Sequence, residues 1–365
     1  MPPEEDNLRS LFSIGGLAVS LFASTALAGP ITVTDMIGRT VTLPAPAERV
    51  ASIPIPLAST IIALDGGTSR LVGMNPLAKS AIEEGILGRI FPEAKAIPSN
   101  VTAPNFVPNV EALAATRPDL VIQWGNYGEE IVKPILNAGL TTMLVDYGTE
   151  AKGRQFMEIT ARAMGRADRI APLVAWRAEV EKDMAAKVAA IPEAKRPTVL
   201  YLARALEGLN AGGAGPAVYN DFSIKLAGGR NAAEELKATK PVSKEQIATW
   251  DPEVILLNSF EPKLTVDFVY NDPVLSLTRA AKAKRVYKMP LGGYRWDPPN
   301  QESPLSWMWL AKLLHPDVFA YDLRAEMKRA YQVLYGYVPT EADIDGILWM
   351  NQQGAATNYA AFKAK

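Results

Sequence analysis

Cysteine is absent from this chain of 365 residues, and histidine occurs once, as His315. Without cysteine the protein has no disulfide, no thiolate metal ligand, no cysteine nucleophile and no lipid anchor on a cysteine after an export signal. With a single histidine, imidazole metal sites and most serine–histidine triads are nearly excluded as well. We therefore predict no catalytic residue, no metal site built by the protein and no resident cofactor.

An excess of either charge is also missing. The chain has 38 basic and 39 acidic residues, a formal net charge of -1, and no long run of either sign. Proteins that bind nucleic acid or anionic membranes usually carry a polybasic surface, so we expect neither partner here. Small molecules or other proteins are the expected partners. A chain of this length that is 48% hydrophobic exceeds the usual size of one domain, which favours two lobes.

The N-terminal region resembles an export signal. An apolar run, Leu11–Ala28, ends in Ala26-Leu27-Ala28, a small-x-small sequence typical of signal-peptidase cleavage before Gly29. Three acidic residues and one arginine precede the run, whereas a signal peptide usually starts with positive charge. We predict a signal peptide over residues 1–28 and a periplasmic mature protein. An uncleaved membrane anchor is the alternative.

Apolar strands and helices alternate along the first half of the mature chain. Helices are expected to be closed by Pro118 and Gly139, and the strand after each is apolar throughout, as in parallel sheets. This order predicts an α/β fold with a parallel sheet. The expected elements are a hairpin of 31–34 with 40–43, strands at 49–55, 119–123 and 142–146, and helices at 57–64, 110–115 and 130–138.

A long charged helix is predicted from about Ala167 to Ile191, because its apolar residues recur at helical spacing. At 1.5 Å per residue it would be roughly 37 Å long, enough to join two lobes as a rigid strut. An ordinary surface helix within one domain is the alternative. After it, a glycine-rich stretch, Gly208–Gly215, lacks the ending and spacing of phosphate-binding loops and is expected to be a flexible loop at the edge of a cleft.

The second half repeats part of the first at an offset of 134 residues. Glu111 aligns with Glu245, and Pro118 aligns with Pro252. Such a repeat on both sides of the long helix indicates an internal duplication, with a ligand cleft between two similar lobes. The predicted boundaries are 29–165 for the N-terminal lobe, 166–192 for the interlobe helix, 193–302 for the C-terminal lobe, and 303–365 for helices that pack on the C-terminal lobe.

Several motifs in order resemble a known family. They are Pro108-Asn-Val-Glu-Ala-Leu-Ala-Ala-Thr-Arg-Pro-Asp-Leu-Val-Ile, Ser243-Lys-Glu-Gln-Ile with Asp251-Pro-Glu-Val-Ile, and Lys284-Arg-Val-Tyr. The chain resembles the class III periplasmic binding proteins of ABC importers, which carry ferric siderophores, haem and cobalamin. The resemblance implies two Rossmann-like lobes that move little on binding, a ligand in a shallow cleft, and an ABC transporter permease as partner. We expect a monomer.

The resemblance also implies one exposed glutamate on each lobe that pairs with arginines of the permease. Glu129 has the expected position in the first lobe, and its neighbour Glu130 is the rival. Glu261 is the candidate in the second lobe, while the spacing of Asp267 fits less well. An arginine–carboxylate pair would give directional docking. The alternative is that these acids only stabilise helix starts.

The predicted ligand contacts lie in loops at the carboxyl ends of strands. A Tyr-Arg-Trp sequence after two glycines offers stacking surface and a fixed positive charge, which suits an anionic ligand with a planar part. Core packing of these aromatic residues, and an ion pair of the arginine with Asp297, are the alternatives. The predicted ligand-binding residues are Trp124, Asn126, Tyr127, Arg204, Tyr219, Tyr294, Arg295 and Trp296.

The sequence leaves the ligand open among several classes. Since cysteine and histidine are scarce, a metal would arrive as a chelate or as an oxyanion. We take a ferric siderophore as the first choice, with cobalamin, haem or an oxyanion such as molybdate as alternatives. A carboxylate-based periplasmic hydrolase is an alternative of another class, and the lack of any catalytic constellation disfavours it.

Overall fold

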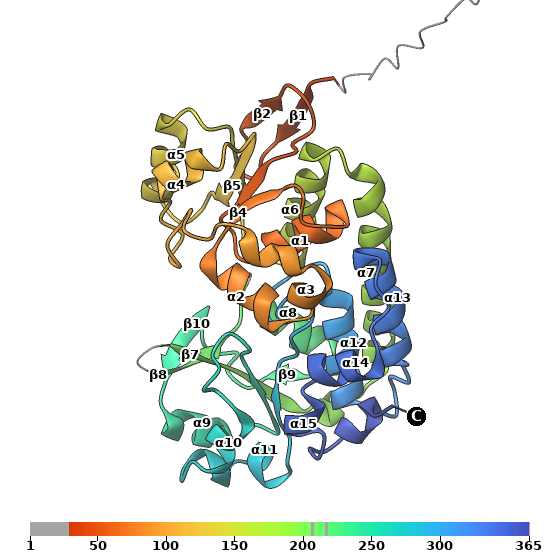
Figure 1. Ribbon diagram of the computed structural model, residues 1–365. Helices are drawn as coiled ribbons and strands as arrows, with labels where there is room; N and C mark the ends of the chain where they lie inside the picture. Colours follow the sequence, from red (N-terminus) through yellow and green to blue (C-terminus); the bar gives the residue numbers. More distant parts are fainter. Residues whose placement is uncertain (1–28, 206–207, 216–217, 365) are drawn as a thin grey trace, which may run out of the picture.

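Two larger β-sheets, one in each half of the chain, organise the protein into two lobes, and a separate two-stranded sheet precedes them (Figure 1). The structure is a computed structural model that describes residues 29–205, 208–215 and 218–364. The predicted signal peptide, residues 1–28, lies outside the described residues. Within the described ranges, no helix combines the length and the apolar character that crossing a membrane requires.

The first lobe contains a parallel sheet of four strands in the order β4-β3-β5-β6. Strands β3, β5 and β6 are buried along their whole length, which explains their mainly apolar sequences. The predicted hairpin forms with the expected bounds and is antiparallel. The strands are β1 (Ile31–Thr34), β2 (Thr40–Leu43), β3 (Val50–Ser52), β4 (Leu71–Met74), β5 (Leu120–Trp124) and β6 (Thr142–Val145). The helices are α1 (Leu57–Asp65), α2 (Pro76–Glu84), α3 (Leu87–Ile90), η1 (Pro92–Ala96), α4 (Val110–Ala115), η2 (Glu129–Ile131), α5 (Lys133–Asn137) and α6 (Glu150–Ala163).

The sheet of the second lobe is mixed rather than parallel throughout. Its order is β10-β8-β7-β11-β12, with β9 beside β7. Strands β9, β11 and β12 run parallel to their neighbours, whereas β8 and β10 are antiparallel. The strands are β7 (Thr198–Ala205), β8 (Gly208–Gly212), β9 (Arg230–Asn231), β10 (Thr239–Val242), β11 (Val254–Leu257) and β12 (Val286–Lys288). The helices are η3 (Glu193–Lys195), α8 (Tyr219–Leu226), α9 (Lys244–Trp250), α10 (Val266–Tyr270), η4 (Leu275–Leu277) and α11 (Arg279–Lys282).

The prediction of a flexible loop at Gly208–Gly215 is wrong for its first five residues, which form β8. Over Gly208–Ala211 buried residues alternate with residues that are not buried, so this segment has the period of a strand despite its glycines. The glycines concealed this alternation because they add no side chain to either face.

Elements on both sides of the long helix match at the offset of 134 residues on which the predicted duplication rests. Helix α4 and helix α9 begin at residues 134 apart, and each is capped by a side chain, that of Asn109 in the first lobe and of Ser243 in the second. After each helix one residue adopts a left-handed backbone, Arg117 with φ of 47° and Asp251 with φ of 43°. Strands β5 and β11 then begin at equivalent positions.

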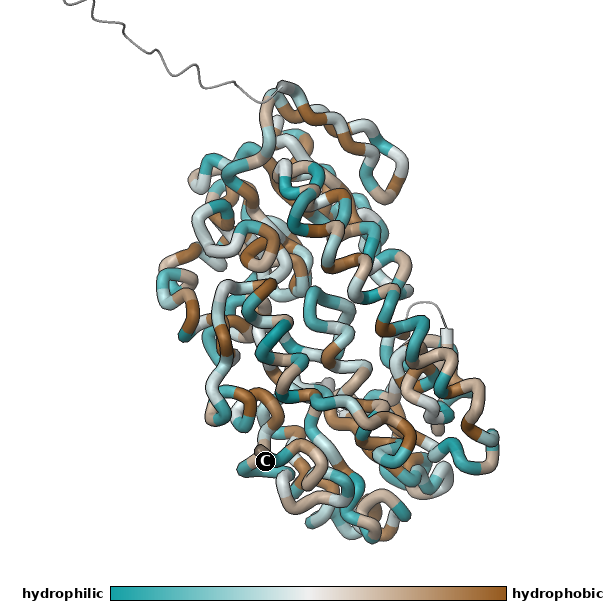
Figure 2. The backbone as a smooth tube through the Cα atoms, turned by 90° about the vertical axis from the view of Figure 1, so that its right-hand side faces the viewer, coloured by the Kyte–Doolittle hydropathy of each residue, from teal (hydrophilic) through white to brown (hydrophobic). Residues whose placement is uncertain are grey.

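Helix α7 (Ala167–Ala189) runs beside both lobes, in green at the side of the molecule in Figure 1. It packs on α6 of the first lobe and on α8 and α12 of the second. Its buried residues include Ile170, Val180 and Met184, as predicted from their spacing. Figure 2 shows teal and brown residues alternating along the helices on this side, as expected where one helix face meets the core.

The C-terminal helices contact both lobes. Helix α12 is almost completely buried beside α7 and α8, and α13 also packs on α1. Their bounds are α12 (Ser303–Leu314), α13 (Leu323–Tyr335), α14 (Glu341–Ile347), α15 (Met350–Gln353) and η5 (Tyr359–Phe362). These helices and α7 connect the lobes along one side.

Candidate ligand-binding site

A cavity of about 300 Å³ lies where the carboxyl ends of strands from both lobes meet. This is the position at which open α/β sheets usually bind ligands. Ile55, Pro56, Phe106, Trp124, Tyr127 and Tyr147 line it from the first lobe. From the second lobe it is lined by Tyr201, Ala203, Val218, Tyr219, Asn220, Thr239, Asn258, Phe260, Tyr294, Asp297 and Pro298.

Four aromatic rings form the wall on the first lobe. Trp124 and Tyr127 are stacked, with ring centres 5.7 Å apart and planes at 27°. Phe106 meets both rings edge-on, at 6.2 Å from Trp124 and 5.3 Å from Tyr127. Tyr147 meets the indole edge-on at 5.9 Å. These contacts hold the indole in a fixed orientation beside the cavity.

Two residues that line this cavity each carry a buried polar group with no hydrogen-bond partner in the described parts of the chain. The groups are the indole Nε1 of Trp124 and the hydroxyl of Tyr294. The two residues are 3% and 0% exposed. An unsatisfied buried polar group costs roughly 1–3 kcal/mol, and native structures keep few of them. A ligand with acceptor atoms in the cavity would offset this cost.

The N-terminal ends of two helices also form part of the wall. Pro56 immediately precedes α1, and Val218, Tyr219 and Asn220 form the start of α8. Neither helix has a side chain that caps its N-terminus. Free amide N–H groups and the helix dipole make such ends favourable for negative charge. Each lobe contributes one of these two ends.

Asp297 is the only acidic residue in the described lining of the cavity, and it is 2% exposed. Its Oδ1 accepts hydrogen bonds from the Tyr201 hydroxyl at 2.9 Å and from the Ser259 amide at 3.1 Å. Its Oδ2 is hydrogen-bonded to the Ser259 hydroxyl. Burial raises the pKa of the Asp297 carboxyl, although the hydrogen bonds from Ser259 and Tyr201 act to lower it.

Comparison with known proteins identifies the family. The family model described as periplasmic binding protein matches residues 100–291, which is more than half of the chain. The chain belongs to the periplasmic binding protein family. The resemblance to the class III binding proteins of ABC importers is thereby confirmed, and members of this periplasmic family bind solutes rather than catalyse reactions.

Three relatives illustrate how far the similarity extends. The molybdate-binding protein MolA of Haemophilus influenzae is 26% identical over 351 residues, which cover 89% of this chain and 96% of MolA. A cobalamin-binding protein of Halobacterium salinarum is 30% identical over 230 residues, 58% of this chain and 60% of that protein. The crystal structure of a periplasmic solute-binding protein from Veillonella parvula is 32% identical, with a TM-score of 0.80 over 89% of this chain and 99% of that one.

Four residues of this binding protein that were predicted to contact ligand line the cavity together. They are Trp124, Tyr127, Tyr219 and Tyr294. Asn126 lies in the same loop as Tyr127 but is exposed and outside the lining. The backbone of Arg204 belongs to β7, and its side chain lies outside the described part of the structure.

Arg295 and Trp296 lie behind the cavity wall rather than in it. Arg295 is 4% exposed, and its Nη2 donates to Glu84 of the first lobe at 2.8 Å. Its guanidinium carbon also lies 5.1 Å from the ring centre of Phe260, which lines the cavity. Trp296 donates its indole N–H to buried Glu302 at 2.7 Å. The ion pair of Arg295 with Asp297, which was the alternative to ligand binding, is not formed, and Arg295 pairs with Glu84 instead.

Sequence analysis missed several lining residues. Tyr147 directly follows the strand predicted at 142–146, and Asn258 and Phe260 lie in the loop that follows β11. The position of strand ends could therefore have identified them. Phe106 and Tyr201 carried no such signal, since one is in a loop between helices and the other is inside a strand.

The predicted docking acids lie in the loops that also supply cavity residues. Glu129 starts η2, two residues after Tyr127, and is exposed with an ion pair to Lys133. Glu130 beside it is exposed as well. Glu261 directly follows Phe260, and its carboxylate accepts a hydrogen bond from the amide of Lys263 at 2.9 Å. Each lobe thus presents an acid close to the cavity.

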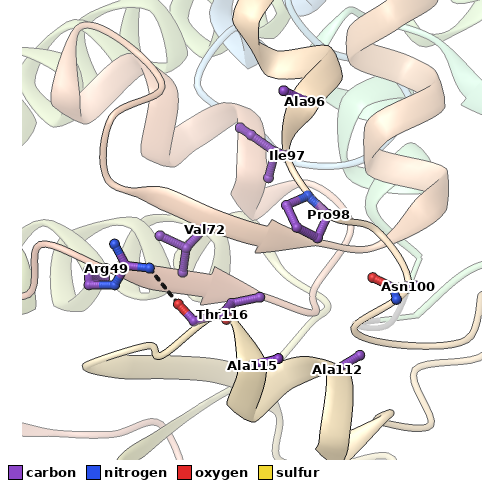
Figure 3. Close-up of a pocket in the computed structure, with 9 residues that line it drawn as sticks. All are labelled: Arg49, Val72, Ala96, Ile97, Pro98, Asn100, Ala112, Ala115 and Thr116. Atoms are coloured by element: carbon purple, nitrogen blue, oxygen red, sulfur yellow. Dashed lines mark hydrogen bonds between the residues drawn. The ribbon is translucent and has the colours of Figure 1, made fainter.

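A wider hollow of about 530 Å³ on the first lobe is a poorer candidate (Figure 3). Arg49 is its one charged lining residue, and its guanidinium is occupied by the carbonyls of Thr116 at 2.5 Å and Arg117 at 2.8 Å. The other lining residues are mostly aliphatic, and none carries an unsatisfied buried group. Nothing there would fix the orientation of a ligand. In the described ranges, no group of three histidine or acidic side chains is arranged to hold a metal ion.

Proposed function

We propose that this periplasmic binding protein captures a small oxyanion of the molybdate class between its lobes and delivers it to the permease of an ABC importer. The observation that carries the proposal is the pair of unsatisfied groups at Trp124 and Tyr294. An indole N–H can only donate, so the ligand must offer an acceptor atom there. The uncapped ends of α1 and α8 favour negative charge on that acceptor.

The similarity to MolA supports the same ligand class. MolA is named for binding molybdate, and the alignment spans 96% of its length. Oxyanions can be held by neutral donors alone when the surrounding dipoles are favourable. This matches a described lining that contains hydroxyls, amides and an indole but no lysine or arginine side chain.

The size of the cavity favours an oxyanion over the iron chelate that we chose first from the sequence. Its volume of about 300 Å³ stands at the lower end of the range of roughly 300–1,000 Å³ for small-molecule sites. A ferric siderophore, haem or cobalamin exceeds this volume and would have to protrude from the cleft. Arg295, the residue expected to bind an anionic chelate, is instead held by Glu84.

A thermal-shift panel on the mature protein tests the proposal. Molybdate, tungstate, sulfate, a ferric siderophore, haemin and cobalamin are compared, because a ligand that binds only the folded state raises the melting temperature. We expect molybdate and tungstate to raise it, with a dissociation constant then measured by calorimetry. A shift with the siderophore, haemin or cobalamin and none with the oxyanions would overturn the proposal.

Delivery to a permease would depend on the predicted docking acids Glu129, Glu130 and Glu261. Each follows a residue of the cavity wall by at most three positions. A permease that contacts both lobes at these acids would therefore also stand over the ligand. We propose that Glu129 and Glu261 form the main docking pair.

A further inference from the structure

Asp297 would disfavour binding of an anionic ligand if it were ionised, because its carboxylate in the cavity would repel the ligand. Building on the proposed capture of an oxyanion, we propose that Asp297 meets the ligand as a protonated carboxyl that donates a hydrogen bond to it. The proton comes from bulk water. Binding of one oxyanion is then coupled to the uptake of one proton by the protein.

The surroundings of Asp297 lack the ion pair that would keep it ionised. Its carboxyl is 2% exposed, and within the described ranges it takes part in no salt bridge. Arg295, whose charge acts to lower the pKa of Asp297, pairs instead with Glu84 at 2.8 Å and donates to the carbonyl of Ser259. A buried carboxylate without a cation is costly, and protonation removes that cost.

The hydrogen bonds of Asp297 indicate which oxygen carries the proton. Oδ1 already accepts from Tyr201 and from the Ser259 amide, which fills its two lone pairs. Oδ2 contacts only the Ser259 hydroxyl, which can either donate or accept. A proton on Oδ2 therefore leaves both bonds to Oδ1 intact and supplies one donor for the cavity.

Among the other titratable groups around Asp297, the tyrosines do not supply this proton near neutral pH, and the variant Asp297→Asn separates the contribution of Lys288 from that of Asp297. Lys288 on β12 donates to the carbonyls of Glu261 at 2.6 Å and Leu264 at 2.8 Å, and burial lowers its pKa to about 8. Burial raises the pKa of each facing tyrosine, so these remain neutral. The facing tyrosines are Tyr147, Tyr201 and Tyr294.

Calorimetry with molybdate between pH 6.0 and pH 8.0, in buffers of different ionisation enthalpy, measures the proton uptake directly. We expect wild-type protein to take up close to one proton per molybdate at pH 8.0. Its affinity should fall about tenfold for each pH unit above the pKa of the carboxyl, as linkage requires. This measurement needs no variant, so it does not depend on the folding of one.

The variant Asp297→Asn distinguishes proton uptake by Asp297 from proton uptake by any other group of the protein. The amide is always neutral and retains donors, so the variant should bind molybdate more tightly than wild type at pH 8.0, without pH dependence or proton uptake. Asp183→Asn is the matched control, because Asp183 is a surface carboxyl of α7 paired with Lys187 at 2.6 Å. It should retain the wild-type pH profile.

Two outcomes would overturn the inference, and they are distinguishable. Binding of molybdate by wild type without proton uptake, or loss of binding in Asp297→Asn at every pH, would contradict the protonated carboxyl alone. The second result would mean that molybdate binding needs the carboxyl in a form that a neutral amide does not replace. Failure of wild type to bind any oxyanion at any pH would contradict the proposed function, and this inference with it.

Discussion

Arg177 of α7 and Glu150 at the start of α6 form a doubly hydrogen-bonded ion pair inside the protein. Nη2 donates to Oε2 at 2.6 Å and Nε donates to Oε1 at 2.9 Å, with Arg177 0% exposed. Arg177 also donates to the carbonyl of Asn300 at 2.5 Å, and its guanidinium carbon lies 5.2 Å from the ring centre of Trp307. The pair therefore links the first lobe, the connecting helix and the second lobe.

We expect Arg177→Ala to lower the free energy of unfolding by about 3–5 kcal/mol, because it leaves the carboxylate of Glu150 buried and without its main partner. Arg154→Ala is the matched control. Arg154 contacts the same carboxylate at 2.9 Å, but its side chain is 21% exposed, so its loss should cost below about 1 kcal/mol. Denaturant unfolding measures both. An equal decrease in the free energy of unfolding in the two variants would contradict the central role of Arg177.

Tyr294→Phe should stabilise the ligand-free protein and weaken binding. The change removes a buried hydroxyl that has no partner in the described structure, so the melting temperature without ligand should rise. It also removes a hydrogen bond to the proposed oxyanion, worth about 1.5–3 kcal/mol, so affinity should fall at least tenfold. Tyr337→Phe serves as the control, because its hydroxyl is bonded to Asp343 at 2.6 Å and its removal should only destabilise. Unchanged affinity in Tyr294→Phe would remove this hydroxyl from the site.

The buried carboxyl of Asp297 predicts a pH-dependent stability even without ligand. Its pKa in the folded protein is raised by burial above its value of about 3.9 in an unfolded chain, so the native state binds this proton more tightly. The contribution to stability is complete below the unfolded pKa and is lost as the pH rises through the folded pKa. Asp297→Asn should therefore raise the melting temperature more at pH 7.5 than at pH 4.5. A constant difference between the two proteins would show that the folded pKa is not raised.

Reversing both proposed docking charges should abolish uptake without changing affinity. We expect cells that carry Glu129→Lys with Glu261→Lys to lose importer-dependent molybdate uptake, since lysines would repel the arginines of the permease. Glu193→Lys, at an exposed position in η3, is the control and should keep uptake. Calorimetry on the purified double variant checks the ligand site. Loss of affinity there would place these acids in ligand binding rather than in docking.

The elements were predictable from the sequence because each follows a local pattern. The hairpin, α4 and the long helix have bounds at or near the predicted ones, since alternation, capping residues and helical spacing are visible within a short window. The repeat at an offset of 134 residues also predicted the paired lobes, which are confirmed by caps and left-handed residues at equivalent positions.

The candidate site was predictable only in part, because partners from distant parts of the chain decide what a side chain does. Arg295 between two aromatic residues suggested a free cation, yet Glu84 lies 211 positions away and binds it. In the same way, no sequence pattern distinguishes Trp124, whose N–H lacks a partner, from Trp296, whose N–H is bound by Glu302. The rule that ligands bind at the carboxyl ends of strands therefore predicted which loops line the cavity, but it did not predict the role of each residue in them.

The two left-handed residues of the duplication should respond differently to glycine. A left-handed backbone costs a non-glycine residue about 1–2 kcal/mol, whereas glycine adopts it freely and adds about 0.5–1 kcal/mol of chain entropy to the unfolded state. Arg117 is exposed, so Arg117→Gly should raise the free energy of unfolding by up to about 1 kcal/mol.

Asp251→Gly is the matched test at the equivalent position. The carboxylate of Asp251 accepts hydrogen bonds from the amide of Arg279 at 2.7 Å and from its Nε at 3.0 Å, and glycine would lose both. We therefore expect no gain in stability, or a loss, when denaturant unfolding of the two variants is compared. A gain in Asp251→Gly as large as that in Arg117→Gly would mean that these hydrogen bonds contribute nothing and that backbone strain alone governs both positions.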